Sequence, residues 1–185
     1  MALIDFHYFE TGIIQIGQLE QAAVQETVTD CINNHEPEFM DAALGVGFYE
    51  AFLTGLAVTP TPEQRWTDLK VGKIFTDSLG KQQRWVGFAP SDKTRVCPTA
   101  AYVYWYYVRE NMIQTGGIGF VQSQPENGST VNPLQKQSYA WNEMFKQVYV
   151  LWEYLYVNRE IYPEFDSQYI DEMFFGRYFQ NTFGI

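Results

Sequence analysis

The sequence predicts a mainly α-helical fold: a helical bundle with a β-hairpin insertion, a long loop and extended termini. Apolar residues recur at helical spacing in three long segments that are rich in aromatic side chains. One stretch, residues 73–88, instead shows two short strand-like runs on either side of a polar turn. The chain has 185 residues, of which 46% are hydrophobic, and this is enough for one core of ordinary size. We therefore expect a single domain over 1–185.

The first residues of the chain are apolar and rich in β-forming types, but they include Gly12 and Gly17. This pattern predicts an N-terminal arm over 1–17, extended or folded as a short strand, that could pack on a neighbouring molecule. From Leu19 onward apolar residues recur at helical spacing, which predicts a first helix that runs to about Asn34.

A proline and a glycine divide the next helical stretch. Pro37 lacks a backbone N–H and suits the first turn of a helix, so we expect the first helix to stop and a second one to begin there. Gly45 interrupts the pattern again and predicts a sharp corner before a third short helix that ends near Gly55. Further on, Trp66 and Leu69 are the expected buried positions of another short helix.

The two strand-like runs flank a turn at 77–81, whose glycine can supply a positive φ, and together they predict a β-hairpin over 73–88. Pro98 then begins a helix that continues to Met112, with aromatic residues on all sides. A helix of this kind is either central in its own domain or partly buried by another chain.

Residues 115–133 are rich in glycine and polar residues and predict a long loop. The longest helix follows, with Asn132 as its cap and Pro133 as its first residue, and we expect it to end at Tyr162–Pro163. The tail, 163–185, holds several phenylalanines, which a chain end would not normally expose. We expect the tail to dock either on its own domain or on a partner.

A formal charge of −10 limits the classes of partner. An acidic surface repels phosphate, and no run of Lys or Arg longer than a dipeptide offsets it, so sequence-specific nucleic-acid binding is disfavoured. No apolar stretch is long enough to cross a membrane, and the first residues lack the basic flank of a signal peptide. We expect no membrane partner and a chain that is cytosolic when made, with Cys31 and Cys97 reduced and buried.

The titratable and nucleophilic residues form no pattern typical of a catalytic or metal site. His7 and His35 are the only histidines in the sequence, and neither belongs to an H-x-x-x-H or H-E-x-x-H pair. Gly116–Gly119 follows a predicted helix and not a strand, so it does not match a phosphate-binding loop. The sequence thus predicts no enzyme, no catalytic residue, no metal ligand and no cofactor. Several acidic residues are interpreted as surface: Asp41, Glu50, Asp166, Asp171 and Glu172.

Aromatic residues make up 17% of the chain, and Tyr and Trp are enriched where proteins meet. Because no cluster calls for chemistry, we interpret this surplus as surface that other subunits bury. The candidate partner-binding residues come from the hairpin, the aromatic helix, the long loop and the tail: Ile74, Phe75, Trp85, Tyr106, Ile118, Phe120, Phe174, Phe175 and Phe179.

The stretch Asn34–Tyr49, with its E-P-E-F, L-G and Phe-Tyr elements, resembles the opening of structural proteins from tailed phages and prophages of gut Bacteroidetes. A hairpin that ends in W-x-G (85–87), a Tyr-rich helix, a glycine loop and a W-N-x-M helix (141–144) follow in the same order. The likeness therefore covers roughly residues 19–160. None of these motifs is catalytic.

Such proteins are head-to-tail connector, or adaptor, subunits: small helical proteins that form a ring beneath the portal and join the capsid to the tail. The resemblance implies a structural virion protein, found at the head–tail junction and in the host cytoplasm during assembly. Its partners would be further copies of itself, the portal protein and tail or further ring proteins, with DNA only passing through the channel. Two alternatives stay open: a non-catalytic ligand-binding or carbohydrate-binding module, because exposed aromatics can stack on sugars, and an enzyme.

Overall fold

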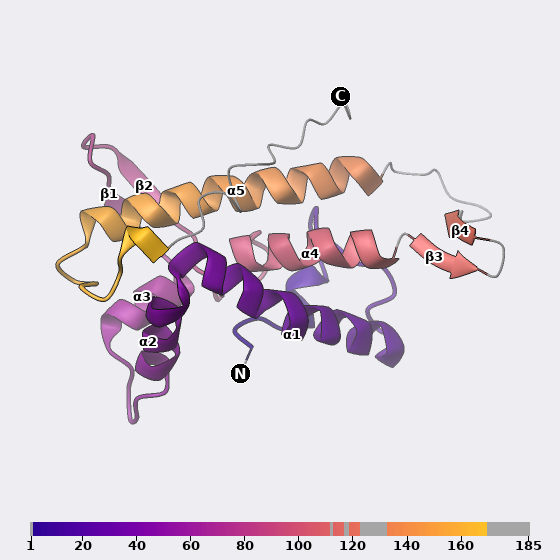
Figure 1. Cartoon of the computed structure of the whole chain (residues 1–185), viewed down its shortest axis with the longest axis horizontal. Coiled ribbons are helices and arrows are strands. Elements are labelled where there is room, and N and C mark those ends of the chain that lie inside the picture. Colours follow the sequence, from indigo (N-terminus) through magenta and orange to yellow (C-terminus); the bar gives the residue numbers. More distant parts are fainter. Residues whose placement is uncertain (1, 112, 117–118, 123–132, 170–185) are drawn as a thin grey trace.

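The structure, a computed structural model, describes residues 2–111, 113–116, 119–122 and 133–169 (Figure 1). Within these ranges the chain is mainly helical, which confirms the predicted fold class. The described part contains five α-helices and two antiparallel hairpins: α1 (Ala22–Leu44), α2 (Val46–Leu56), α3 (Gln64–Val71), β1 (Lys73–Thr76), β2 (Gln82–Trp85), α4 (Pro98–Asn111), β3 (Ile113–Gly116), β4 (Gly119–Gln122) and α5 (Pro133–Val157).

The first helix, α1, is one continuous helix of 23 residues with Pro37 in its interior. The prediction that Pro37 begins a new helix is therefore wrong. Proline inside a helix removes one hydrogen bond, here to the carbonyl of Asn33, and costs about 3 kcal/mol. The buried stripe of α1 continues on both sides of it through Ile32 and Phe39. Because each such side chain contributes about 1.5–3 kcal/mol when fully buried, burial of the stripe outweighs the loss.

The sharp corner predicted at Gly45 is confirmed. Gly45 has a φ of 78°, which a residue with a side chain rarely adopts, and it separates α1 from α2 with no further linker. Near the end of α2, a side chain at Gly55 would collide with the indole ring of Trp66, so glycine at this position lets α3 pack closely against α2. Trp66 and Leu69 are buried in α3, as predicted.

Strands β1 and β2 form the predicted hairpin, with Lys73 opposite Trp85 at its open end. The carboxylate of Asp77 closes the turn by accepting hydrogen bonds from two backbone N–H groups within it, at 2.9 and 2.8 Å. Trp85 is fully buried, and its indole N–H donates to the carbonyl of Leu69 at 2.9 Å. The hairpin is therefore anchored to the core by its last residue and ordered at its tip.

Helices α4 and α5 pack side by side and, with α1, form the main core (Figure 1). Every residue of α4 from Pro98 to Trp105 is buried, so the aromatic side chains of this segment are covered within the chain. This decides between the two alternatives for this helix: it is central in its own domain. α5 has 25 residues and a length of about 37 Å. It begins at Pro133, as predicted, and ends at Val157, a few residues before the predicted end.

The segment predicted as a long loop, 115–133, begins with part of a second hairpin. β3 and β4 are antiparallel, with Ile113 opposite Gln122 and Gly116 opposite Gly119. β3 starts almost directly after α4. Most of the remainder of the predicted loop lies outside the described residues.

The N-terminal arm packs on its own domain. The backbone N–H groups of Leu3 and Ile4 donate to the two carboxylate oxygens of Glu36 on α1, at 2.7 and 3.1 Å. Phe6–Phe9 forms a 3-10 turn (η1), where an extended arm or strand was predicted, because the carboxylate of Asp5 accepts a backbone hydrogen bond and caps the turn. Phe9, the last residue of η1, is completely buried, so the arm packs against the core of its own chain.

Candidate functional site

Two of the predicted partner-binding residues are buried on the inner side of the first hairpin. Phe75 packs edge-on against Tyr154 of α5, with 5.2 Å between ring centroids, and Trp85 packs edge-on against Phe88 at 5.0 Å. Both belong to the hydrophobic core of this chain. Their assignment to a partner surface is therefore corrected: the sequence marked them as apolar, but it did not show which face of the hairpin α5 covers.

The other predicted residues lie in different surroundings. Ile74 is half exposed on β1, on the opposite side of the hairpin from Phe75. Tyr106 is half-buried on α4, where its ring stacks on His35 with 3.9 Å between centroids. The remaining candidates fall outside the described residues or, for Phe120 in β4, have no described side chain: Ile118, Phe120, Phe174, Phe175 and Phe179.

The tip of the first hairpin presents an apolar side chain to solvent. Leu79 lies in the turn and is 80% exposed. The turn is fixed to α5, because the backbone N–H of Ser78 donates to a carboxylate oxygen of Glu153 at 2.8 Å. Leu79 is thus held in place at a defined distance from α5. We call Ile74 and Leu79 the hairpin patch.

The outer side of α5 presents a second apolar surface. Tyr149 and Tyr156 lie two turns apart on one side of the helix and are 52% and 62% exposed. The ring of Tyr149 packs edge-on against Phe145 and Trp152, with centroid distances of 4.8 and 5.4 Å. This packing orients an exposed ring in a way that suits a contact residue. We call Tyr149 and Tyr156 the helix patch; neither was among the residues predicted from the sequence.

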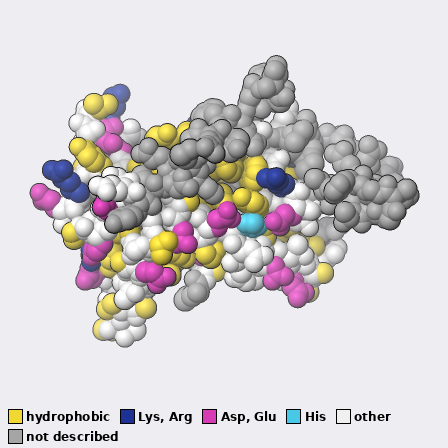
Figure 2. Space-filling view, viewed as in Figure 1, with side chains coloured by type: hydrophobic (Ala, Val, Ile, Leu, Met, Phe, Trp, Pro, Cys, Tyr) yellow, Lys and Arg dark blue, Asp and Glu magenta, His cyan; other side chains and the backbone are white. Residues whose placement is uncertain are grey.

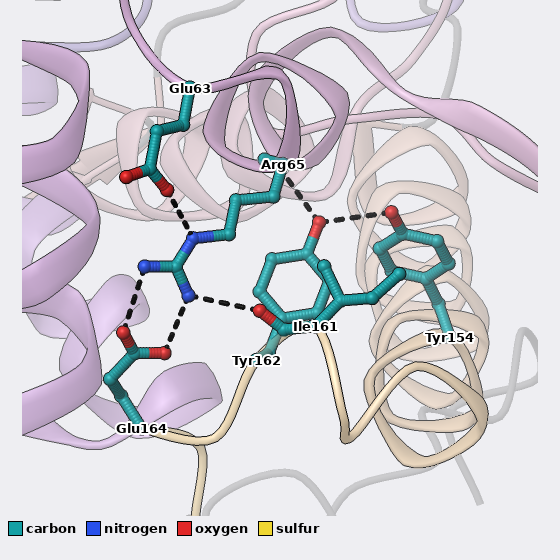
Figure 3. A network of polar contacts seen from close by, with 6 residues as sticks. All are labelled: Glu63, Arg65, Tyr154, Ile161, Tyr162 and Glu164. Atoms are coloured by element: carbon teal, nitrogen blue, oxygen red, sulfur yellow. Dashed lines mark hydrogen bonds and ion pairs between the residues drawn. The ribbon is translucent and has the colours of Figure 1, made fainter.

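A polar network joins α3 to the segment that follows α5 (Figure 3). The guanidinium of Arg65 donates two hydrogen bonds to the carboxylate of Glu164, at 2.8 and 2.9 Å, and one to Glu63 at 2.7 Å. It also donates to the backbone carbonyl of Ile161 at 2.9 Å and lies over the ring of Trp66, 4.1 Å from its centroid. Arg65 therefore binds the end of the long helix to α3 through several contacts at once.

Two tyrosines extend this network toward the core. The hydroxyl of Tyr162 donates to the backbone carbonyl of Arg65 at 2.8 Å and lies 3.0 Å from the hydroxyl of Tyr154 (Figure 3). The hydrogen bonds from Arg65 hold the pKa of Glu164 below its ordinary value. The positive charge of the network meets carboxylates of the same chain, so the network serves to hold two segments together. We call it the Arg65 junction: Glu63, Arg65, Tyr154, Tyr162 and Glu164.

A second polar cluster joins α1 to α4. Cys31 and His35 lie one turn apart on α1, and Glu110 approaches from the last turn of α4. One sulfur, one nitrogen and one oxygen atom of these three side chains lie within 4.8 Å of one another. His35 Nε2 is 3.0 Å from Glu110 Oε1, and its Nδ1 is 3.3 Å from an oxygen of Glu38. We call Cys31, His35, Glu38 and Glu110 the His35 cluster.

The His35 cluster was not predicted from the sequence. The metal-site patterns tested for the histidines pair them with a second histidine, whereas the structure pairs a cysteine with a histidine four residues later. That spacing alone places both side chains on one face of a helix, so it was a usable signal. Glu110 had no such signal, because it is 75 residues from His35 in the sequence.

An open hollow of 390 Å³ lies between η1 and the start of α1. Its lining combines the rings of Phe6 and His7 with the carboxylate of Glu10 and several glutamines. Pockets for small molecules commonly have volumes of about 300–1,000 Å³ and enclose most of their ligand. This hollow has such a volume but is widely open to solvent.

No family model, curated protein or solved structure matches the chain. In the described part of the chain, no helix is both long enough and apolar enough to cross a membrane. Two observations therefore bear on function: the two exposed patches and the resemblance of the stretch that begins at Asn34.

Proposed function

We propose that the chain is a structural virion protein that joins the portal and capsid to the tail, as one subunit of a ring-shaped head-to-tail connector. The observation that carries this proposal is the presence of two different exposed apolar patches on one subunit, the hairpin patch and the helix patch. The resemblance of residues 34–49 to connector proteins of tailed phages supports it independently. In this role the chain acts through protein–protein contacts and performs no catalysis.

A closed ring is built from heterologous contacts, in which one surface of each subunit meets a different surface of the next. The hairpin patch and the helix patch are two such surfaces, and the hydrogen bond from Ser78 to Glu153 fixes their relative position. In the proposed ring, Leu79 of one subunit contacts Tyr149 and Tyr156 of its neighbour. Tyrosine suits this contact because its rigid ring supplies a large apolar area at a low cost in conformational entropy.

The proposed partners are further copies of this chain, the portal protein and tail or further ring proteins. A formal charge of −10 suits a ring whose channel lets DNA pass without gripping its phosphates. The proposed location is the head–tail junction of the virion, and the host cytoplasm during assembly. On this proposal, a portal or major capsid gene lies close to the gene for this chain.

Binding to a portal ring tests the proposal. The chain is mixed with the portal protein encoded nearest to it, and the mixture is separated by analytical ultracentrifugation. We expect the chain to co-sediment with portal rings at a fixed ratio, even if it is monomeric alone, because the portal can template the ring. A chain that stays monomeric and also fails to bind portal rings contradicts the proposal.

Substitutions in each patch test the surfaces themselves. We expect Leu79→Asp and Tyr156→Glu each to weaken assembly on the portal about tenfold or more, as for residues at the centre of an interface. Val46→Glu is the matched control, because Val46 is 62% exposed on α2 and belongs to neither patch. Circular dichroism checks that each variant is folded. If assembly on the portal weakens equally in all three variants, or weakens in neither patch variant, the two patches are not the contact surfaces.

The open hollow beside η1 favours a second function, a non-catalytic ligand-binding or carbohydrate-binding module, because Phe6 could stack on a sugar ring there. A screen of glycans and metabolites for a saturable rise in Tm tests this alternative. We expect His7→Ala, at the rim of the hollow, to remove such a shift. A saturable shift combined with no binding to portal rings would favour this module over the connector.

A further inference from the structure

Three side chains with metal-binding atoms meet where α1 packs against α4. Cys31 and His35 come from successive turns of α1, and Glu110 comes from the last turn of α4. Their ligand atoms lie within 4.8 Å of one another. Exposure increases across the group: the thiol is buried, the His35 side chain is 14% exposed and the Glu110 side chain is 53% exposed. An ion could therefore enter from the side of Glu110, the most exposed of the three side chains.

Two carboxylates contact the histidine of this group. Glu38 contacts Nδ1 of His35, and Glu110 contacts Nε2. Among the described residues, each of these carboxylates forms its ion pair with this histidine. Figure 2 shows a histidine with acidic side chains on either side of it, and a Lys or Arg side chain next to this group, on the face that is turned to the viewer. An imidazole carries at most one positive charge, so these three side chains together have a net negative charge, which attracts a divalent cation.

We propose that Cys31, His35 and Glu110 bind a zinc ion, with Nε2 of His35 as its ligand atom and Glu38 on the other ring nitrogen. Thiolate, imidazole and carboxylate are ligand types that zinc takes in proteins, and three protein ligands leave a fourth position for water. A carboxylate on the second nitrogen is a common partner of metal-binding histidines, because it fixes the tautomer that presents a lone pair to the metal. The ring of Tyr106, stacked at 3.9 Å, holds the imidazole plane.

The geometry needs only small movements to accept the ion. Ligand atoms around tetrahedral zinc lie roughly 3.3–3.8 Å apart, so the widest separation in the group, at most 4.8 Å, has to shrink by about 1 Å. The side chain of Glu110 is free to adjust to the ion, because it is half exposed at the end of a helix. Burial raises the pKa of the Cys31 thiol to about 12, so the ion has to displace a proton that now points to the carbonyl of Val103, 3.6 Å away.

The zinc site is independent of the proposed connector function. It ties α1 to α4 through atoms from both helices, whereas the hairpin patch and the helix patch contain none of its ligands. Loss of the metal would loosen the contact between α1 and α4 while the two patches stay in place. Portal binding and metal binding can thus be measured, and can fail, separately.

Titration of the purified full chain with Co²⁺ and Zn²⁺ tests the site. We expect one Co²⁺ per chain, with the absorption band of a cobalt–thiolate bond, and displacement of that ion by equimolar Zn²⁺. Cys31→Ser should remove the band, and both Cys31→Ser and His35→Asn should lower zinc affinity about 10- to 100-fold or more. Glu38→Gln should keep the band and lower affinity about tenfold, because it removes only the charge that supports the histidine.

Two variants are matched controls for these changes. Cys97→Ser alters the other buried cysteine, and His7→Asn breaks the other His–Glu pair, in which Nδ1 of His7 is 2.6 Å from Glu10. Both should bind zinc as the wild type does. Thermal unfolding in the presence of a chelator identifies variants that do not fold without metal. If Cys31→Ser does not fold, Glu110→Gln tests the site instead, because Glu110 lies at an exposed position. The proposal is overturned if the folded wild type binds no Co²⁺, or if His7→Asn removes binding while Cys31→Ser and Glu110→Gln retain it.

Discussion

The Arg65 junction and the His35 cluster both join elements that are distant in the sequence, but they balance their charges in different ways. In the junction, the guanidinium of Arg65 lies between two carboxylates and donates to both. In the cluster, Glu38 and Glu110 share one histidine. The junction therefore holds a permanent cation between its two carboxylates and has a net charge of −1, whereas the cluster has no permanent cation and has a net charge of −2 with a neutral imidazole. This difference separates a group of side chains that holds the fold together from one that can hold a ligand.

The largest expected effect is stabilisation by zinc through the His35 cluster. At a zinc concentration 100 times the Kd, a single bound ion should raise the free energy of unfolding by about 2.7 kcal/mol. At the same zinc concentration, Cys31→Ser should reduce this rise to about 1.4 kcal/mol or less, and Arg65→Met should leave it intact. Thermal unfolding with zinc and with chelator measures both variants. A rise in Cys31→Ser as large as that of the wild type would remove the distinction between the two groups.

Loss of the cation from the Arg65 junction should have the second-largest effect on stability. Arg65→Met removes charge-assisted hydrogen bonds and leaves the carbonyl of Ile161 without this donor, so we expect a loss of about 1–3 kcal/mol in the free energy of unfolding, with or without zinc. Urea denaturation measures the loss. Arg159→Met, at an exposed position just beyond α5, should change stability by less than about 0.5 kcal/mol. If the two variants behave alike, the junction does not stabilise the fold.

Removal of one hydroxyl group from the junction should have a smaller effect. Tyr162→Phe keeps the buried ring but leaves the backbone carbonyl of Arg65 and the hydroxyl of Tyr154 without this partner, which should cost about 1 kcal/mol. Tyr156→Phe, on the exposed side of α5, is the matched control and should be nearly neutral. Equal unfolding midpoints in urea for Tyr162→Phe and the wild type would speak against the network in Figure 3.

The smallest effect should be a dependence on pH that comes from the junction. Because Arg65 lowers the pKa of Glu164 in the folded chain, the contribution of this pair is fully present above pH about 4.5, the ordinary pKa, and is lost as the pH falls through the lowered value. Glu164→Gln should flatten that part of the stability curve, measured by urea denaturation from neutral to acid pH. Glu160→Gln, at an exposed position, should not. A curve for Glu164→Gln that falls as steeply as that of the wild type would show that the pair is not the source.

The fold was predictable where local pattern and local chemistry agree. The hairpin follows from two short apolar runs and a turn that Asp77 closes with its own side chain. The break expected at Pro37 fails because the burial that carries the helix past it involves residues of other elements, which a local rule does not weigh. For the same reason, strand alternation places Ile74 and Phe75 on opposite sides of the hairpin, but only the position of α5 decides which one is covered.

The candidate sites were less predictable, since each combines a local pattern with a distant partner. The spacing of Cys31 and His35 is visible in the sequence, but the approach of Glu110 depends on how α4 packs against α1. Tyr149 and Tyr156 were expected neither in the core nor among the contact residues. Their spacing puts them on one side of α5, and the exposure of that side becomes known only once the buried side is identified.

Electron cryomicroscopy of the chain assembled on its portal ring tests the connector proposal most directly. We predict a closed ring in which the hairpin patch of each subunit, at Leu79, lies against the helix patch of the next, at Tyr149 and Tyr156. A portal ring with no bound copies of the chain, or a ring joined through other surfaces with both patches facing solvent, would contradict the proposal.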